Sequence, residues 1–244
     1  MIDKSTSRIR RMFGEIAPWY DFLNHFLSGG IDRLWRGYVV KKVRPEGGDR
    51  KILDVCTGTA DLAMAFWKRY RVPVVGTDFC PEMLEIGKRK IQKKGWTDEN
   101  IQLLEADTCQ LPFADDTFQV VSVAFGLRNV ENTQRGMAEM VRVCVPGGKV
   151  AILEFSTPTL FPFRQIYLFY FRHVLPKIGQ FTARNRWDAY EYLPQSVGAF
   201  PQGRTLAEML EAAGLERVTY QTLTLGIATL YLGYKKTPVS SRNA

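Results

Sequence analysis

The segment KILDVCTGTAD, residues 51–61, joins a short apolar run to a turn that contains a single glycine. The run from Lys51 to Cys56 predicts a buried strand, because its apolar residues are continuous and turn-forming residues bound it. Helical periodicity follows from about Ala60 to Tyr70, and basic residues at its end complement the helix dipole. A strand that leads through a tight turn into a helix is the first unit expected of an α/β sheet.

The same alternation continues along the chain. Further strands are expected at the apolar runs Val72–Thr77, Ile101–Glu105, Phe118–Phe125 and Lys149–Phe155. Helices are expected between them, at Pro81–Lys94 and Thr133–Val143. The last two strands, about 216–223 and 227–234, are separated by too few residues for a helical crossover, so they should pair antiparallel. The sequence therefore predicts an α/β fold, with a doubly wound, mostly parallel sheet that ends in a C-terminal antiparallel hairpin.

Helical patterns flank this sheet on both sides. Residues 1–45 predict an N-terminal helical cap with a break at Pro18. Asp32 is expected to cap a helix that carries Leu34, Trp35, Tyr38 and Val39 on one face. Near the other end, Thr205–Glu208 has the pattern of a capping box, which predicts the start of another helix.

Residues 157–200 fit no strand of the sheet. Within them Leu160–Phe171 is densely aromatic, which leaves two interpretations. It is either a helix packed on the edge of the core or a lid that lines a pocket for a large apolar substrate. In both cases residues 1–244 are expected to form a single domain, with the helical cap and this aromatic insertion attached to one sheet.

The composition is that of an ordinary globular protein. Of 244 residues 45% are apolar and 24% charged, and four scattered cysteines with two histidines predict neither a disulfide framework nor a usual zinc site. No signal peptide and no run of about 18 apolar residues is found, so a cytoplasmic protein is expected. The net charge of +8 is compatible with nucleic acid, an anionic membrane surface or an anionic substrate, and selects none of them.

Four aspartates fall at the predicted carboxyl ends of strands or just beyond them, Asp54, Asp61, Asp78 and Asp107. Ligands of doubly wound sheets bind at that edge. Asp78 ends the second strand, where a carboxylate can accept both hydroxyls of a ribose. Asp54 and Asp61 flank the first turn and suit an ammonium or sulfonium group.

The first turn also argues against a dinucleotide. A dinucleotide-binding turn needs G-x-G-x-x-G so that a pyrophosphate can approach the backbone, and this turn has only Gly58. Asp61 would repel the pyrophosphate, unless it is simply a favourable charge at a helix N-terminus. A ligand with a ribose and an amino acid but no phosphate, S-adenosylmethionine, fits better than NAD.

Four segments carry a resemblance to a known family: Tyr20–Ser28 through Trp35; Phe125–Val130; Arg142–Val143 with Pro146–Gly148 and Glu154–Ser156; and Leu223–Ile227. Together they resemble the ubiquinone/menaquinone biosynthesis C-methyltransferases, a family of class I S-adenosylmethionine-dependent enzymes. The resemblance implies a Rossmann-like methyltransferase sheet, S-adenosylmethionine as methyl donor and no metal. The chain departs from the family pattern at Asp32, where histidine is usual, and at Ala124, where serine is common.

The resemblance also implies the residues that bind the cofactor, Asp54, Gly58, Thr59, Asp78, Asp107 and Thr108. Thr59 would contact the methionine moiety and Asp54 its amino group. Asp78 would hold the ribose, and Asp107 and Thr108 would face the adenine.

The implied substrate is a polyprenylated quinol, either demethylmenaquinol or the methoxy-polyprenyl-benzoquinol of ubiquinone biosynthesis. Arg128 is expected to stabilise the developing phenolate, and Asn129 to orient the ring hydroxyl or a water. The alternatives are a surface ion pair for Arg128 and a helix N-cap for Asn129. The two histidines, His173 and His25, are the only side chains of a type that ordinarily titrates near neutral pH. The base stays open among these histidines and the residues Tyr20 and Asp21 that line the pocket from the cap, and His173 is otherwise a packed core histidine.

A prenylated quinol resides in a bilayer, so the basic charge predicts a peripheral contact with anionic lipid at the inner face of the membrane. No nucleic-acid-binding motif is found, and no nucleic-acid partner is expected. Self-association is compatible with the family resemblance, although the sequence has no interface pattern. The alternatives are a methyltransferase for another small aromatic or lipid and, less favoured, a nucleic-acid-binding module.

Overall fold

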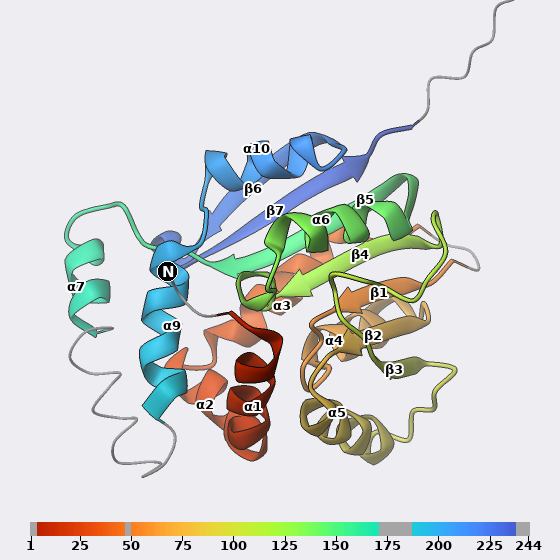
Figure 1. The fold of residues 1–244 in the computed structure, drawn as a ribbon, viewed down its shortest axis with the longest axis horizontal. Helices are drawn as coiled ribbons and strands as arrows, with labels where there is room; N and C mark the ends of the chain where they lie inside the picture. Colours follow the sequence, from red (N-terminus) through yellow and green to blue (C-terminus); the bar gives the residue numbers. More distant parts are fainter. Residues whose placement is uncertain (1–3, 47–49, 171–186, 238–244) are drawn as a thin grey trace, which may run out of the picture.

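The computed structural model describes residues 4–46, 50–170 and 187–237, and a seven-stranded sheet forms its centre (Figure 1). The strands are β1 Ile52–Val55, β2 Val74–Asp78, β3 Ile101–Glu105, β4 Phe118–Ala124, β5 Cys144–Phe155, β6 Leu215–Leu223 and β7 Ala228–Lys235. Their order is β3-β2-β1-β4-β5-β7-β6. The first five strands pair parallel, and β7 runs antiparallel to both β5 and β6. The predicted doubly wound sheet and its C-terminal hairpin are therefore confirmed.

Helices cover both faces of the sheet (Figure 1). They are α1 Thr6–Ile16, α2 Tyr20–Leu27, α3 Ile31–Val43, α4 Asp61–Tyr70, α5 Pro81–Lys93, α6 Thr133–Val143, α7 Phe163–Phe169, α9 Trp187–Ala199 and α10 Arg204–Ala212, with short 3-10 turns η1 Ala17–Trp19, η2 Leu127–Asn129 and η4 Thr224–Gly226. One apolar core joins the strands to α6 and α10, for example through Met140 and Leu210. A second core joins them to α3, α4 and α5 through Val39, Phe66 and Leu84.

Two helix starts differ from the predicted ones. The residue before α3 is Gly30, with a φ of 78°, and Asp32 lies inside the first turn as a buried partner of Arg36 rather than as a cap. The capping box at Thr205 is also wrong, because α10 follows Gly203 and no side chain caps it. At both places a glycine with positive φ turns the chain into the helix, so a capping side chain is not needed.

The strand β5 and the helix α3 correct two further details. β5 begins at Cys144 and not at Lys149, because the segment that contains Pro146 continues the strand across a register shift against β4. On α3, Leu34 is 71% exposed, whereas Trp35 and Val39 are buried. The predicted inner face is therefore right for Trp35 and Val39 and wrong for Leu34, and it also includes the charged pair of Asp32 and Arg36.

The cap and the aromatic segment lie at the same end of the molecule (Figure 1). The predicted break at Pro18 is confirmed as the 3-10 turn η1 between α1 and α2. In the aromatic segment α7 buries Tyr167 but leaves Phe163 and Phe169 exposed, so only one side of it packs on the protein. Whether residues 157–200 act as a lid stays a prediction, and His173 lies outside the described residues.

Candidate functional site

A cleft opens where the parallel strands β1, β2 and β4 end, and the cap covers one side of it. Its free space, counted out to the open mouth, is about 600 Å³. The lining residues are Thr6, Phe13, Tyr20, Cys56, Gly58, Asp78, Phe79, Met83, Asp107, Thr108, Ala124, Phe125, Gly126, Asn129, Val130 and Glu131. The edge of the sheet at which the sequence predicts ligand binding is therefore the edge that is hollowed.

Asp78 is the buried acid of this cleft. Its Oδ2 accepts the Gly58 N–H at 2.8 Å and its Oδ1 accepts the Cys80 N–H at 2.9 Å. Burial raises the pKa of Asp78 to about 6, although these backbone bonds act to lower it. The Phe79 N–H is a third backbone donor to Asp78. Since a carboxylate has about four lone-pair sites, Asp78 keeps one with which to accept a hydroxyl.

The glycine turn leaves room beside this carboxylate. Gly58 has a φ of 56°, and a Cβ placed on it would lie 3.3 Å from the Met83 methyl and 3.8 Å from the Tyr20 ring. A side chain here would fill the floor of the cleft, so glycine meets both a conformational and a steric requirement. The prediction that Gly58 allows a close approach to the backbone agrees with this geometry.

Asp107 and Thr108 form another part of the wall. Asp107 Oδ1 accepts the Cys109 N–H at 2.8 Å, and the Thr108 hydroxyl lies 3.3 Å from Cys56 Sγ. These side chains come from the loop after β3 and reach the same cleft as Asp78 of β2. The structure thus brings together four of the six predicted cofactor residues, Gly58, Asp78, Asp107 and Thr108.

The other two predicted cofactor residues lie beneath the lining. Asp54 is 1% exposed and accepts the hydroxyls of Thr57 at 2.7 Å and Ser122 at 2.8 Å. Burial raises its pKa to about 6. Thr59 is also buried, and its hydroxyl donates to Asp21 at 2.5 Å. The side chains of Asp54 and Thr59 therefore support the turn from below, and their direct contact with a ligand remains a prediction.

Arg128 is buried, and the alternative of a surface ion pair is wrong. Its Nη1 donates to Glu154 Oε1 at 2.7 Å and to the Phe125 carbonyl, and its backbone N–H donates to Glu154 Oε2 at 3.3 Å. The guanidinium carbon lies 5.3 Å from the centre of the Phe155 ring. Its buried Nε has no hydrogen-bond partner in the described part of the chain. Arg128 is thus fixed by Glu154 and by the Phe125 carbonyl, and its Nε is left as a donor.

Asn129 lines the cleft next to Arg128. The alternative role of Asn129 as a helix N-cap is wrong, because Asn132 caps α6 by accepting the Arg135 N–H at 3.0 Å. Asn129 Oδ1 instead accepts the hydroxyl of Tyr192, from α9, at 3.1 Å. With Oδ1 so engaged, the Asn129 amide nitrogen is left as a donor.

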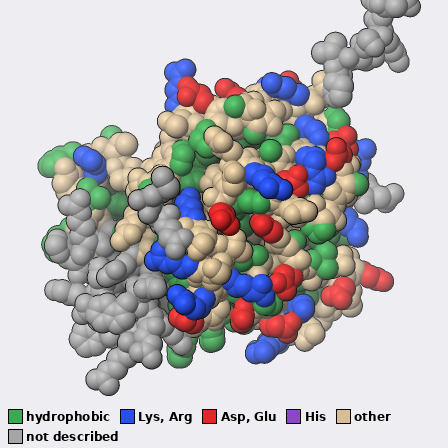
Figure 2. Space-filling model, viewed as in Figure 1, with side chains coloured by type: hydrophobic (Ala, Val, Ile, Leu, Met, Phe, Trp, Pro, Cys, Tyr) green, Lys and Arg blue, Asp and Glu red, His purple; other side chains and the backbone are tan. Residues whose placement is uncertain are grey.

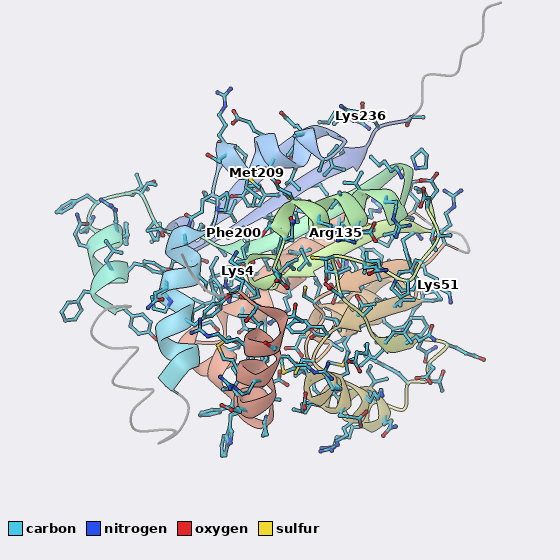
Figure 3. All side chains as sticks on the ribbon, viewed as in Figure 1. Lys4, Lys51, Arg135, Phe200, Met209 and Lys236 are labelled. Atoms are coloured by element: carbon cyan, nitrogen blue, oxygen red, sulfur yellow. The ribbon has the colours of Figure 1, made fainter. Side chains whose placement is uncertain are left out.

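Residues at the N-terminal end of the chain lie at the cleft and near the pair of Arg128 and Glu154. Tyr20 lines the cleft as predicted, whereas Asp21 does not and instead faces Thr59. Lys4 lies with its Nζ 5.8 Å from the centre of the Phe200 ring, near the tip of α9 (Figure 3). Burial lowers the pKa of Lys4, although the nearby charge of Glu154 acts to raise it.

Sequence reasoning missed Glu154 and Tyr192 as partners of the predicted catalytic pair. A charged residue near the end of an otherwise apolar strand was the available signal for Glu154. No local pattern marks Tyr192. His25 lies 2.8 Å from Asp32 through Nδ1 and does not line the cleft.

The chemistry of the cleft suits a nucleoside without phosphate. Acidic side chains at Asp78 and Asp107 can accept hydroxyl and amine protons, and the turn that carries Gly58 has no second glycine for a pyrophosphate. Among the residues that the structure describes, no group of three or more His, Cys, Asp and Glu could hold a metal ion. The residues present fit S-adenosylmethionine.

Fold and cleft together define an S-adenosylmethionine-dependent methyltransferase. A methyltransferase of this class from Thermotoga maritima has the same fold, with a TM-score of 0.62 and 18% identity over 93% of this chain and 100% of its own. The chain belongs to the ubiE/COQ5 methyltransferase family, whose model matches residues 1–235.

Relatives agree with this assignment. The ubiquinone/menaquinone biosynthesis C-methyltransferase UbiE of Geobacter sp. strain M21 is 46% identical, over 96% of this chain and 99% of its own. The demethylmenaquinone methyltransferase of Bacteroides fragilis is 40% identical, over 95% and 94%. The family expected from the sequence is therefore confirmed.

Proposed function

We propose that this protein transfers a methyl group from S-adenosylmethionine to a ring carbon of a polyprenylated quinol, either demethylmenaquinol or the methoxy-polyprenyl-benzoquinol of ubiquinone biosynthesis. The buried guanidinium of Arg128, fixed by Glu154 beside a cleft residue, carries the proposal. Relatives named for both pathways support it. The same relatives leave the choice between the two rings open.

When bound, S-adenosylmethionine supplies an electrophilic methyl group on a sulfonium. Asp78 would accept a ribose hydroxyl with its free lone pair, and Asp107 with Thr108 would hold the adenine. Gly58 would allow the backbone to approach the ligand. These residues orient the donor, which is the main requirement when the leaving group is already activated.

Arg128 and Asn129 would act on the quinol. Loss of a ring hydroxyl proton moves electron density onto the ring carbon, and a cation beside the oxygen stabilises the resulting phenolate. Among the described residues the buried Nε of Arg128 has no partner, and Asn129 has an amide nitrogen left over by its bond from Tyr192. Both would donate to the ring oxygen, and the base stays open, with His173 among its candidates.

We also propose a peripheral contact with anionic lipid at the edge that carries α7. Leu160, Phe161, Phe163, Ile166 and Phe169 are 40–79% exposed there. On the face shown in Figure 2, Lys and Arg side chains are interleaved with Asp and Glu rather than gathered in one patch. No helix of the described residues is long and apolar enough to cross a membrane. Self-association remains a prediction.

The test is an anaerobic assay with purified protein, methyl-labelled S-adenosylmethionine, and reduced demethylmenaquinol beside the benzoquinol. Label on a ring carbon is expected, and it should fall by two orders of magnitude or more in Arg128→Met, as is typical when a donor to a developing oxyanion is removed. If a protein that still binds the cofactor methylates neither quinol, the proposed substrate class is wrong. Adding anionic vesicles to the assay, with a Phe163→Ser/Phe169→Ser variant, tests the lipid contact through vesicle binding.

A further inference from the structure

Lys90 of α5 lies at the centre of a charged cluster outside the lining of the cleft. Its Nζ donates to Asp21 Oδ2 at 2.7 Å, to Thr59 Oγ1 at 3.1 Å, and to Asp61 Oδ1. These partners belong to α2 of the cap, to the glycine turn and to the first residue of α4. An ammonium group has three N–H donors, so this cluster uses the whole Lys90 head group.

The cluster is more protected than an ordinary surface ion pair. The side chains of Lys90, Asp21 and Asp61 are 24%, 29% and 20% exposed. Thr59 is buried, and its hydroxyl both donates to Asp21 and accepts from Lys90. The orientation of the Thr59 side chain is therefore fixed from two sides, and the cap and the turn share the same polar contacts.

Lys90 also keeps two like charges together. Asp21 and Asp61 both contact its ammonium group. Within the described ranges Arg36 is a further cation near Asp61, since its Nη1 lies 3.9 Å from Asp61 Oδ2, but Arg36 is paired with Asp32. Without Lys90 the two carboxylates would face each other with Asp21 left uncompensated. Because the two carboxylates carry like charges, they would repel each other, and the cap would move away from the turn.

The position of the cap matters for the cleft. Tyr20 and Gly58 both line it, and each directly precedes a residue that Lys90 holds, Asp21 and Thr59. The Tyr20 ring lies 3.8 Å from the place a Cβ would take on Gly58. A shift of α2 against the turn would therefore change the wall that the methyl donor meets.

We propose that Lys90 is a positioning residue for the methyl donor, which it serves by holding Asp21 of the cap against Thr59 of the glycine turn. It needs no contact with the donor itself. This role concerns the binding of S-adenosylmethionine and does not depend on which acceptor is methylated. Removal of Lys90 should therefore weaken donor binding in a protein that still folds.

The experiment measures the affinity of the full chain for S-adenosylmethionine by calorimetry. Lys90→Met is expected to weaken it about tenfold, within the usual range of coupling between two sites. Lys88→Met is the matched control, since Lys88 lies on the same helix in an exposed pair with Glu85. The affinity of the Lys88→Met variant for S-adenosylmethionine should equal that of the wild type. Hydrogen exchange of residues 20–27 without ligand should quicken in Lys90→Met and not in Lys88→Met.

A second substitution tests the electrostatic part. Adding Asp21→Asn to Lys90→Met removes one of the two repelling charges, so the double variant should bind S-adenosylmethionine roughly threefold more tightly than Lys90→Met alone. If the two substitutions acted independently, their losses of binding free energy would add instead. Asp21→Asn alone should weaken binding a few-fold, and it keeps the test available if Lys90→Met does not fold. Unchanged affinity in both single variants, or loss of stability without loss of affinity, would overturn the proposal. Quinol turnover does not enter any of these measurements.

Discussion

Replacing Glu154 by Gln should separate the buried ion pair from the rest of the site. Three donors converge on the carboxylate: Arg128 Nη1 at 2.7 Å and the Phe155 N–H at 2.9 Å reach Oε1, and the Arg128 N–H at 3.3 Å reaches Oε2. Gln keeps the shape of Glu but has only one acceptor oxygen. Placed at the Oε1 position, it retains the two shorter bonds and turns its NH₂ group toward the Arg128 N–H.

The expected cost follows from what is lost. Arg128 is 6% exposed and Glu154 1%, so the guanidinium would lose its counter-charge in a buried place. Removing one partner of a buried pair typically costs about 3–5 kcal/mol. Because two of the three hydrogen bonds persist, we expect a loss near 3 kcal/mol, or roughly 6–12 °C in Tm for a chain of this size.

Urea unfolding of Glu154→Gln checks the value, with Glu105→Gln as the control. Glu105 pairs with Arg10 at 3.1 Å, but both side chains are about half exposed, so its loss should cost less than about 1 kcal/mol. A double variant, Arg128→Met/Glu154→Leu, should recover only part of the stability, since it removes the unpaired buried charge but leaves the backbone N–H groups of residues 128 and 155 without the carboxylate that accepts them. It should nevertheless be inactive on quinol. Equal stability of the two single Gln variants would refute the reasoning.

Asp78→Asn should weaken S-adenosylmethionine binding by roughly ten- to a hundredfold, because a hydrogen bond to a charged group contributes about 1.5–3 kcal/mol; equal affinities in calorimetry would contradict this role. Since burial raises the pKa of Asp78 to about 6, its carboxylate is lost as the pH falls through that value. Wild-type affinity should then be about tenfold weaker at pH 5 than at pH 7, whereas Asp78→Asn should show no such dependence. Gly126→Ala would place a Cβ 2.3 Å from Cys56 Cβ and should cost about 3 kcal/mol or more in urea unfolding. Gly37→Ala, whose Cβ meets nothing within 4 Å, should stabilise α3 by about 0.5–1 kcal/mol, and similar effects of both alanines would be inconsistent with the packing described.

The sheet could be predicted because each of its signals is local. Strands β3 and β4 agree with their predicted ranges to within a residue. β4 is buried along nearly its whole length, whereas β3 lies at the edge of the sheet and buries only alternate residues. Helix starts were harder, because Gly30 and Gly203 replace a capping side chain by a backbone conformation. No propensity shows in advance which of two nearby residues will take that role.

The side-chain contacts within the site follow from the sheet topology only in part. Asp78 and Gly58 are 20 residues apart, but both follow strand ends that must meet, so topology alone brings them together. Glu154 and Arg128 meet because β4 and β5 are neighbours, and this pairing also follows from the sheet. Tyr192 reaches Asn129 only through the course of α9, which no pattern in the chain indicates.

The acidic edge of a basic protein has a thermodynamic consequence. Burial raises the pKa values of Asp54 and Asp78 to about 6, so the native state binds more protons than the unfolded chain between about pH 4 and 6. Their contribution to stability is therefore present below the unfolded pKa and is lost as the pH rises through 6. At neutral pH both carboxylates are charged at a cost, and a hydroxyl of a bound ribose would offset part of it at Asp78. The burial that destabilises this edge thus makes it selective for a ligand that donates hydrogen bonds and carries no phosphate.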